Sequence, residues 1–381
     1  MPDFSPAPLR IAPVSGTADL KRFILMPAGL YADRPEWRAP LYWERRMHLS
    51  EKHNPVFKHL DWQAWIAWRG DTPVGRITAQ IDSLRKAEHG DDVGYFGMLE
   101  APDEREVFEQ LLATAEAWLR GRGMSAVHGP FNLTINDECG LLVDGFDTPP
   151  MMMMGHGHCY YQEHVEALGY TKAVDMLAYW IDLAFAHPRP MRRLLDRYAP
   201  RIRVRQIERK RYTEELSLLR DIFNDAWAQN WGFVPFTEAE FQDMGNTLKL
   251  LIADDLVQIA EVDGEPAAFI VGLPNLNEAA RDLKGRLLPT GVFKLLWRMK
   301  ISFPDTSRVP LMGVRQKFQR GPMGAALAFA VIAAEQTSLY DHGARGCELS
   351  WILEDNKGMR DIIESIGGER YKTYRVYEKT L

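Results

Sequence analysis

The sequence has few cysteines, no strong excess of charge of either sign and no long apolar run. Its three cysteines, Cys139, Cys159 and Cys347, lack a paired spacing. This argues against a disulfide framework and is typical of proteins in a reducing compartment. The net charge of -6 over 381 residues provides no global basic field to attract nucleic acid. The longest apolar stretch, Ala325–Ala334, is too short to cross a bilayer.

The N-terminal segment, MPDFSPAPLR, lacks the cationic and then apolar pattern of a signal peptide. Together with the cysteine usage, this predicts a cytoplasmic protein, and peripheral contact with the inner face of a membrane is compatible with it. The composition, 46% apolar and 26% charged, is that of an ordinary globular protein. A length of 381 residues favours two domains.

The two halves of the sequence repeat the same order of predicted elements. Each half has two apolar runs around a polar turn, at Gly70-Asp71 and at Asp263-Gly264, which predicts two β-hairpins. Later in each half a helix ends at Gly169 or Gly367, and a strand follows. The pattern indicates a duplicated α/β unit with an α+β mixed sheet. We place the boundary in segment 188–201, so that the domains span 1–190 and 200–381.

Each half also contains one long predicted helix. In segment 103–123, Val107, Leu111 and Leu119 lie on one face, which predicts an amphipathic helix. Segment 324–343 is apolar on nearly all sides, which predicts a buried helix.

Three stretches, residues 129–161, 223–241 and 348–379, carry a resemblance to a known family. With the order of the elements, they resemble the double-GNAT acyltransferases, which include bacterial ceramide synthases. The resemblance implies two tandem GNAT-like domains. It also implies transfer of a long-chain acyl group from acyl-CoA, the cosubstrate, to the amine of a lipid such as a sphingoid base or 3-ketosphinganine, with no metal.

The resemblance places the acyl-CoA site in the second half. GNAT enzymes cradle the CoA pyrophosphate at the turn before the central helix, and VRQKFQRGPMGAALAF (314–329) occupies that place here. Glycines let the backbone approach phosphate oxygens, and a helix N-terminus favours an anion. The spacing of the glycines departs from the family pattern by one residue, and Pro322 lacks an N–H donor. The candidate cofactor-binding residues in this turn are Val314, Gln319, Arg320, Gly321, Gly324 and Ala325.

Asn356 follows the strand that opens the pantetheine slot in the GNAT fold, and it is the seventh candidate cofactor-binding residue. The usual general acid of the family, a tyrosine seven residues further on, is replaced here by Ile363. The matching turn of the first half, 93–110, is acidic and would repel a pyrophosphate. We therefore expect the first half to shape the acceptor site.

The densest polar stretch, 132–161, supplies candidates for the acceptor side. Acyl transfer to an amine needs a base, donors for the oxyanion and aligned substrates. The candidate catalytic residues are Glu138 or His158 as base and Tyr161 as donor. The candidate substrate contacts are Asn132, Asn136, His156, Trp231, Phe293 and Trp297. For each of these residues a purely structural role, such as a turn or a core hydrogen bond, is the alternative.

Two other kinds of chemistry are disfavoured in the same stretch. A zinc site at His156 and His158 lacks a fourth ligand at a recognised spacing. A nucleophilic Cys159 activated by His158 is disfavoured, because adjacent side chains on a strand point apart.

The segment 277–303 is a predicted insert with a basic amphipathic helix. The helical stripe in this segment consists of Val292, Leu295, Leu296 and Met299, with Phe293 and Trp297 beside it. The segment also carries six lysines and arginines against two acids. This favours contact with a membrane surface or an acyl chain, and an ordinary core-facing helix is the alternative. Two rival functions stay open: an aminoacyl-tRNA-dependent transferase of similar doubled fold, and a catalytically silent acyl-CoA- or lipid-binding module.

Overall fold

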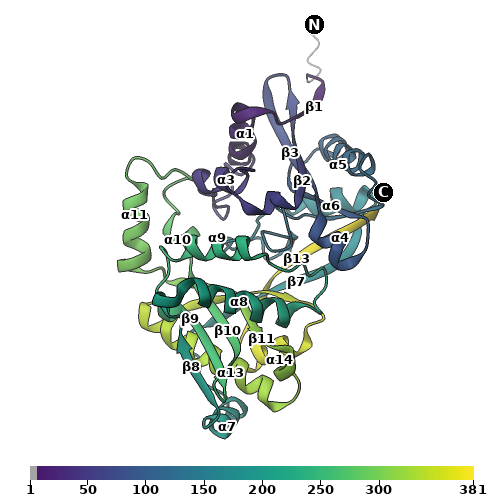
Figure 1. Ribbon diagram of the computed structural model, residues 1–381. Helices are drawn as coiled ribbons and strands as arrows, with labels where there is room; N and C mark the ends of the chain where they lie inside the picture. Colours follow the sequence, from purple (N-terminus) through teal and green to yellow (C-terminus); the bar gives the residue numbers. More distant parts are fainter. Residues whose placement is uncertain (1–6) are drawn as a thin grey trace. The chain divides into compact units, whose positions relative to one another are not determined.

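The computed structural model describes residues 7–381, which divide into two compact units (Figure 1). The first unit ends at Asp175 and also contains Lys284–Arg286 and Lys372–Leu381. The second unit consists of Met176–Leu283 and Leu287–Tyr371. Two boundaries between the units fall inside strands. One lies in β7 (Thr171–Asp182), and the other lies in β13 (Glu369–Thr380). Each of these strands therefore contributes residues to both units.

The first unit is built on a sheet with the strand order β1-β2-β3-β4-β5-β13, and β6 also pairs with β13. Its strands are β1 (Leu9–Pro13), β2 (Leu60–Arg69), β3 (Thr72–Asp82), β4 (Val93–Glu100), β5 (Ala126–Gly129) and β6 (Leu141–Asp144). Its helices are α1 (Gly16–Leu25), α2 (Pro27–Leu30), α3 (Tyr42–His48), η1 (Pro55–Lys58), α4 (Ser83–His89), α5 (Arg105–Arg120) and α6 (Tyr160–Ala167). The buried face of α5, which includes Val107, Phe108 and Leu111, forms much of the core of this unit.

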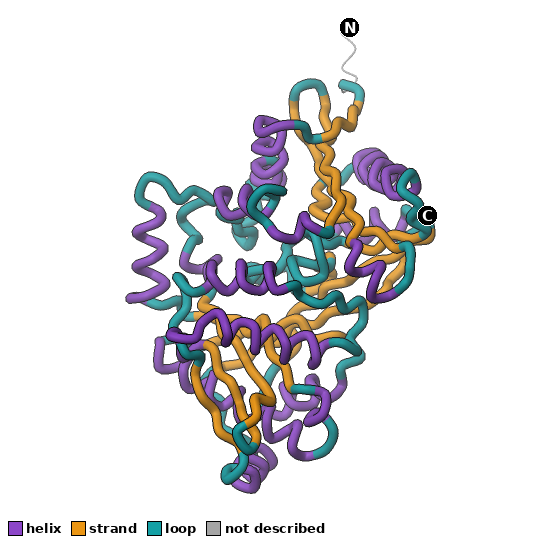
Figure 2. Tube along the Cα trace, in the orientation of Figure 1, coloured by secondary structure: helices purple, strands orange, loops and turns teal. Residues whose placement is uncertain are grey.

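The second unit repeats this plan with the strand order β7-β12-β11-β10-β9-β8. Its strands are β8 (Ile202–Gln206), β9 (Val257–Val262), β10 (Glu265–Pro274), β11 (Thr306–Val314) and β12 (Gly346–Leu353). Its helices are α7 (Arg189–Tyr198), η2 (Arg209–Arg211), α8 (Tyr212–Trp227), α9 (Glu238–Leu248), η3 (Asp254–Leu256), α10 (Leu276–Ala279), α11 (Gly291–Trp297), η4 (Arg298–Ser302), α12 (Gln316–Gln319), α13 (Pro322–His342) and α14 (Lys357–Ser365). Figure 2 shows α8 crossing in front of the strands of this unit.

The α13 helix is the core helix of the second unit. It packs on β10, and Leu327 and Val331 are fully buried in the same cluster as Ile270. Within the described part of the chain it is the one helix that is long and apolar enough to cross a membrane, and 61% of its apolar window is buried inside the protein. The predicted buried helix is therefore confirmed, although it begins at Pro322 rather than near Gly324.

The repeated elements predicted from the sequence are also confirmed. The antiparallel pairs β2–β3 and β9–β10 are the two hairpins, with their turns at the expected glycines. The α6 helix leads through Gly169 into β7, and α14 leads through Gly367 into β13. The functional domains 1–190 and 200–381 stay a prediction. The compact units differ from these spans because the last strand of the chain completes the sheet of the first unit.

Candidate active site

In the second unit, the parallel strands β11 and β12 pair along only part of their length. The paired residues run from Thr306 opposite Gly346 to Val309 opposite Leu349, and the ladder ends there. A pocket of about 630 Å³ lies at this separation, lined by residues 312–314 of β11 and residues 350–353 of β12. Its volume is in the range of small-molecule and cofactor sites. The predicted opening beside β12 is therefore confirmed, and its ligand stays a prediction.

The helices α13 and α14 form two further walls of this pocket. The lining residues of α13 extend from Gly324 to Leu339, which corresponds to about 22 Å of helix. The α14 helix contributes Met359, Ile362 and Ile366. The pocket is therefore long and mainly apolar, and it begins at a helix N-terminus.

The N-terminus of α13 has the backbone geometry expected of a phosphate-binding turn. Gly321 is the N-cap with φ 83°, in the left-handed region that favours glycine, and no atom lies within 4 Å of a Cβ added there. Gly324 has a different reason to be glycine, because an added Cβ would lie 2.6 Å from Phe318 O. Gly324 thus permits α12 to pack closely against α13.

Most of the candidate cofactor residues line the same pocket. These are Val314, Gln319, Gly321, Gly324, Ala325 and Asn356, whereas Arg320 is exposed at the edge of the turn. The side-chain amide of Gln319 is occupied, because its Nε2 donates to Ala226 O at 3.1 Å and to Val314 O at 2.8 Å. Gln319 therefore holds the turn in shape with its side-chain amide.

Asn356 is the N-cap of α14. Its Oδ1 accepts a hydrogen bond from Met359 N at 3.1 Å, and its Nδ2 makes no hydrogen bond to any described residue. Asn356 therefore starts the helix with one side-chain atom and keeps a donor for a ligand at the pocket wall. Ile363, at the place of the usual tyrosine, is buried against Leu177 and Tyr179.

A buried polar cluster reaches the pocket through Ser350. Ser350 Oγ donates to Glu348 Oε1 at 2.5 Å, Arg308 Nε donates to Ser350 Oγ at 2.8 Å, and Tyr371 OH donates to the second carboxylate oxygen. Glu348 and Arg308 are almost fully buried, and Ser350 lines the pocket. The sequence prediction missed this cluster. The one feature of the sequence that could have indicated it is the spacing of Glu348 and Ser350, because residues two apart on a strand face the same side of the sheet.

Trp351 supplies a second polar group at the separation of the strands. It lines the pocket, and its buried Nε1 has no hydrogen-bond partner among residues 7–381. A buried indole N–H normally finds an acceptor. Trp351 Nε1 is therefore a buried donor without an acceptor in the described part of the chain.

The aromatic stretch after α8 forms the wall beside β11. Trp227, Gln229 and Asn230 line the pocket, and Trp227 Nε1 donates to Met312 O at 2.9 Å. Trp231, the predicted contact in this stretch, is not among the lining residues.

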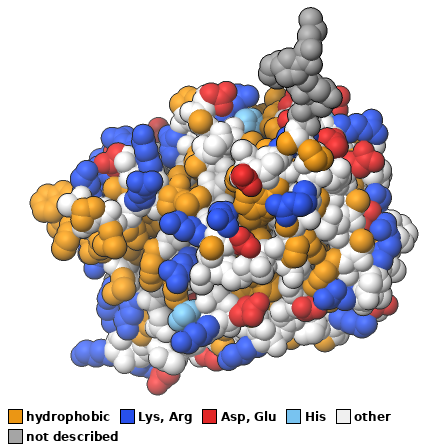
Figure 3. Space-filling model, turned by 90° about the horizontal axis from the view of Figure 1, so that it is seen from above, with side chains coloured by type: hydrophobic (Ala, Val, Ile, Leu, Met, Phe, Trp, Pro, Cys, Tyr) orange, Lys and Arg blue, Asp and Glu red, His pale blue; other side chains and the backbone are white. Residues whose placement is uncertain are grey.

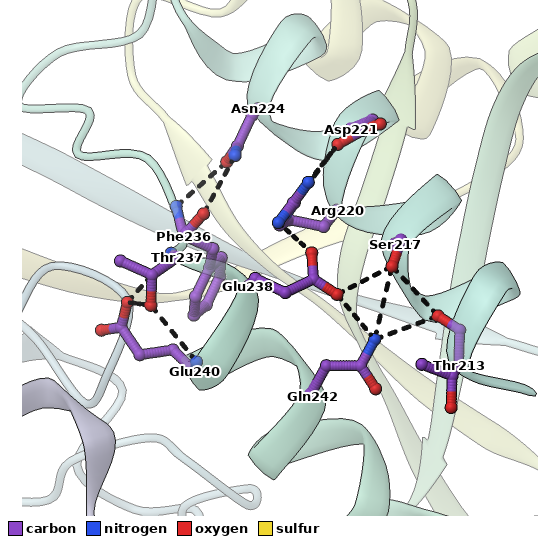
Figure 4. Close-up of polar contacts among 10 residues, drawn as sticks. All are labelled: Thr213, Ser217, Arg220, Asp221, Asn224, Phe236, Thr237, Glu238, Glu240 and Gln242. Atoms are coloured by element: carbon purple, nitrogen blue, oxygen red, sulfur yellow. Dashed lines mark hydrogen bonds and ion pairs between the residues drawn. The ribbon is translucent and has the colours of Figure 1, made fainter.

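Side-chain hydrogen bonds close this stretch into a fixed loop (Figure 4). The amide of Asn224 bonds both the N–H and the C=O of Phe236, at 3.0 Å and 3.1 Å. Thr237 and Glu240 then form a capping box that starts α9. The loop therefore presents a rigid wall to the pocket.

In the first unit, the chain itself occupies the corresponding position next to β4. The β4 and β5 strands pair only from Val93 to Tyr95 on the β4 side. Beyond this point, Phe131 N donates to Phe96 O, and Met98 N donates to Asn132 Oδ1, both at 2.8 Å. Asn132 thus takes up a backbone donor that a ligand would otherwise use. Asn136 lies in the next turn, where its N–H donates to Thr134 Oγ1.

Glu138 is held in a partly buried ion pair. Its Oε1 accepts from Arg45 Nη2 at 2.5 Å and its Oε2 accepts from Asn132 Nδ2 at 2.8 Å. Burial is the largest single effect and raises the pKa of Glu138, but the charge and the hydrogen bond of Arg45, with the hydrogen bond of Asn132, together outweigh it, and the pKa falls to about 2. The carboxylate is thus ionised and a weak proton acceptor at neutral pH. Its catalytic role stays a prediction that this geometry does not favour.

Tyr161 belongs to a buried network around Glu100. The hydroxyls of Tyr161 and Tyr31 both donate to Glu100 Oε2 at 2.8 Å, and Ala101 N donates to Tyr161 OH at 3.1 Å. Burial raises the pKa of Tyr161 well above its ordinary value, so its hydroxyl stays protonated.

His156 and His158 lie around the same Tyr31. The ring of His158 stacks on Tyr31 with 4.6 Å between centroids, and its Nε2 lies 3.2 Å from Leu30 O. Because a carbonyl can only accept, Nε2 carries the proton and Nδ1 is the basic nitrogen. Burial lowers the pKa values of both histidines, that of His156 to about 4. His158 is therefore neutral at pH 7 and able to accept a proton.

Phe293 and Trp297 are the two predicted contacts that lie on the surface. Their side chains are 75% and 60% exposed on α11. No group of three or more His, Cys, Asp or Glu side chains suited to hold a metal ion occurs in residues 7–381.

The whole chain is similar in sequence to two known bacterial proteins. No family model matches it. It is 50% identical over 366 residues to protein YghO of Escherichia coli K12, covering 95% of this chain and 93% of that protein. It is 48% identical over 381 residues to the bacterial ceramide synthase of Caulobacter vibrioides, covering 100% of this chain and 99% of that protein.

Solved structures show the same fold at low sequence identity. A tandem GNAT protein from the clavulanic acid biosynthesis pathway aligns with a TM-score of 0.56 and 13% identity, covering 98% of both chains. A GCN5-related N-acetyltransferase from Sphaerobacter thermophilus aligns with a TM-score of 0.54 and 13% identity, covering 98% of this chain and 96% of that one. The predicted tandem GNAT fold is therefore confirmed.

The N-cap geometry generates a prediction about stability. Asn356→Ala removes the acceptor for Met359 N, and we expect it to lower the free energy of unfolding by about 1 kcal/mol. Asn356→Asp keeps an acceptor at the same place and should cost much less. Urea unfolding of the three proteins, followed by tryptophan fluorescence, measures both changes. An equal loss in both variants would contradict the assigned cap.

The depressed pKa of His156 generates a prediction about pH. The unfolded chain binds a proton at this residue below about pH 6.5, whereas the folded chain does so only below about pH 4. The contribution of His156 to stability is therefore fully present above pH 6.5 and is lost as the pH falls toward 4. Thermal unfolding midpoints at pH 7 and pH 5 should differ less in His156→Gln than in the wild type. The matched control His53→Gln, at an exposed histidine, should keep the wild-type difference. A wild-type difference in His156→Gln as well would refute the assignment.

Proposed function

Since this chain belongs to the same family as the bacterial ceramide synthase of Caulobacter vibrioides, we propose that it is an acyl-CoA-dependent N-acyltransferase. The acceptor is the amine of a long-chain lipid, a sphingoid base or its 3-keto form. The observation that carries this proposal is the pocket at the separation of β11 and β12, whose long walls are mainly apolar. A cofactor arm and an acyl chain both suit such a pocket, because each buried CH₂ contributes about 0.8 kcal/mol to binding.

The donor would enter with its pyrophosphate at the N-terminus of α13. Free backbone N–H groups and the helix dipole favour an anion there, and Arg320 adds a solvent-exposed cation. The pantetheine arm would follow the unpaired edges of β11 and β12, which offer backbone donors and acceptors beyond Val309 and Leu349. Asn356 Nδ2 is the side-chain donor beside this path.

In the proposed reaction an amide C–N bond replaces the thioester C–S bond, and one proton is transferred. The neutral amine attacks the thioester carbonyl carbon, the C–S bond breaks, and the CoA thiolate takes up the proton that the amine loses. In this proposal Trp351 Nε1, a buried donor without an acceptor, donates to the carbonyl oxygen as negative charge develops there. Ser350 Oγ, in contact with Glu348, offers a relay that carries the amine proton away.

The first unit supplies the remaining candidates of the acceptor side. His158 has the tautomer and protonation state of a base, whereas the hydroxyl of Tyr161 is engaged with Glu100. Their roles, and those of Glu138, His156, Asn132 and Asn136, stay predictions. We also keep the expectation of a cytoplasmic protein.

Release of free thiol tests the proposed reaction. Purified protein given hexadecanoyl-CoA and sphinganine or its 3-keto form should release CoA and form the amide, detected by mass spectrometry. Arg320→Ala should raise the KM for acyl-CoA several-fold, and the loss should shrink at high salt because Arg320 is exposed. The matched control Lys317→Ala removes an exposed cation of the same turn that is paired with Glu265, and should have a smaller effect. Absence of thiol release with any long-chain amine would overturn the proposal.

The α11 region supports contact with a membrane surface. Nine large hydrophobic side chains are exposed in residues 7–381, and six of them lie in the segment from Leu288 to Ile301. We call these six the α11 patch: Leu288, Val292, Phe293, Leu296, Trp297 and Ile301. Figure 3 shows hydrophobic side chains gathered at the left edge, where Figure 1 places α11, with cationic side chains beside them.

The two sides of α11 have different partners. Leu295 and Met299 are buried and hold the helix to the second unit, so the predicted stripe is only partly exposed. The exposed side combines the α11 patch with Lys294 and Lys300. Apolar and aromatic residues with neighbouring cations match the acyl and headgroup layers of an anionic bilayer. A lipid-modifying enzyme would meet its substrate at such a surface.

Vesicle binding tests this contact. We expect the wild type to co-sediment with vesicles of phosphatidylglycerol and phosphatidylethanolamine, and Phe293→Ala with Trp297→Ala to weaken binding about 10-fold or more. Trp43→Ala is the matched control, because this tryptophan of the first unit is 63% exposed and lies outside the α11 patch. Equal weakening in the control, or unchanged binding in the double variant, would contradict a membrane role for the patch.

A further inference from the structure

The pocket of the second unit has an unpaired carboxyl group in its deep part. Glu335 lies on α13, lines the pocket and is 2% exposed. Neither Oε1 nor Oε2 has a hydrogen-bond partner in the described part of the chain. Glu335 lies eleven residues beyond Gly324 along α13, which is about 17 Å from the end at which the pyrophosphate is expected. The group therefore belongs to the inner end of the pocket.

The surroundings of Glu335 are apolar or already satisfied. Ile181, Leu183 and Ile332 line the same pocket. The neighbouring polar residue, Gln336, donates from Nε2 to Leu183 O at 2.8 Å, and its Oε1 lies 2.8 Å from His187 Nε2. The side-chain amide of Gln336 is thus hydrogen-bonded within the protein, whereas the carboxyl group of Glu335 remains for a ligand.

The space for this carboxyl group is built into the sheet. A Cβ added to Gly272, near the end of the buried strand β10, would lie 1.9 Å from Glu335 Oε1. The pairing of β10 with β11 also shifts register between Val271 and Leu273. Glycine inside a strand weakens it and marks a close approach. Gly272 and Glu335 therefore form a matched pair, and the carboxyl group is not a chance intrusion into the core.

The protonation state of Glu335 fits a neutral ligand group. Burial, and to a lesser extent the charge of Asp255, raises the pKa of Glu335 well above its ordinary value. The protonated carboxyl both donates and accepts hydrogen bonds. A hydroxyl group also does both, and it carries no charge that would have to be buried.

We propose that Glu335 recognises a hydroxyl group on the acyl chain of the donor, so that the enzyme prefers a hydroxyacyl-CoA. This inference rests on the proposed function. An unsubstituted chain packed beside Glu335 leaves a buried polar group unsatisfied, whereas a hydroxyl group at the matching carbon satisfies it. Glu335 is thus a specificity-determining residue and takes no part in the proton transfers.

A series of donors tests this specificity. Hexadecanoyl-CoA is compared with its monohydroxylated isomers, with the hydroxyl group at successive carbons, by kcat/KM and by calorimetric affinity. We expect the wild type to prefer one isomer about 10-fold or more. In Glu335→Leu this preference should disappear, because no group remains there to bond the hydroxyl group. In Glu335→Gln, which keeps a donor and an acceptor, part of the preference should remain.

No preference for any isomer in the wild type, or a full preference in Glu335→Leu, overturns the inference and leaves the proposed acyl transfer intact. A loss of affinity for unacylated CoA in Glu335→Leu would show that Glu335 contacts the cofactor arm instead, and also overturns it. If no donor binds or reacts, the proposed function itself is wrong. The unfolding temperature of Glu335→Leu should rise, because the variant removes an unsatisfied buried group, and this checks that the variant is folded.

Discussion

The incomplete pairing of β11 with β12 is the constraint on which the rest of the site depends. Backbone N–H and C=O groups need partners, and two parallel strands that separate after four residue pairs leave a row of them without a neighbouring strand. The surrounding elements keep this gap open. Trp227 is bonded to Met312 on one side, and the cap at Asn356 begins α14 on the other. An extended ligand arm with amide groups of its own is the kind of molecule that satisfies such edges.

The first unit shows what happens when the same opening is closed by the protein. There, Phe131 and Asn132 bond to Phe96 and Met98 of β4, and the carboxylate of Glu138 is held by Arg45. The two copies of the fold thus differ at the same place in the sheet. One copy offers a lined pocket, and the other offers a rigid polar cluster. This difference supports a division of roles in which the second unit alone takes the acyl donor.

Local patterns predicted much of the fold, because periodicity and turn residues determine hairpins and helices regardless of their partners. The hairpins, α5, α13 and the place of Asn356 follow from such patterns. The exchange of β13 into the first unit does not, because a strand has the same sequence pattern whichever sheet it joins. The Arg308, Glu348 and Tyr371 cluster was also missed, since these residues are far apart in the sequence. Glu335 gave no signal either, because a single acid in an apolar helix does not show which side chains surround it.

The most direct test of this account is a crystal structure with a non-hydrolysable thioether analogue of a long-chain acyl-CoA. The account predicts the pyrophosphate at the N-terminus of α13 near Gly321 and the arm between the separated ends of β11 and β12. It also predicts that Asn132 remains bonded to Met98. An analogue bound beside β4 of the first unit, or bound anywhere that leaves the pocket between β11 and β12 without it, would contradict the central claim.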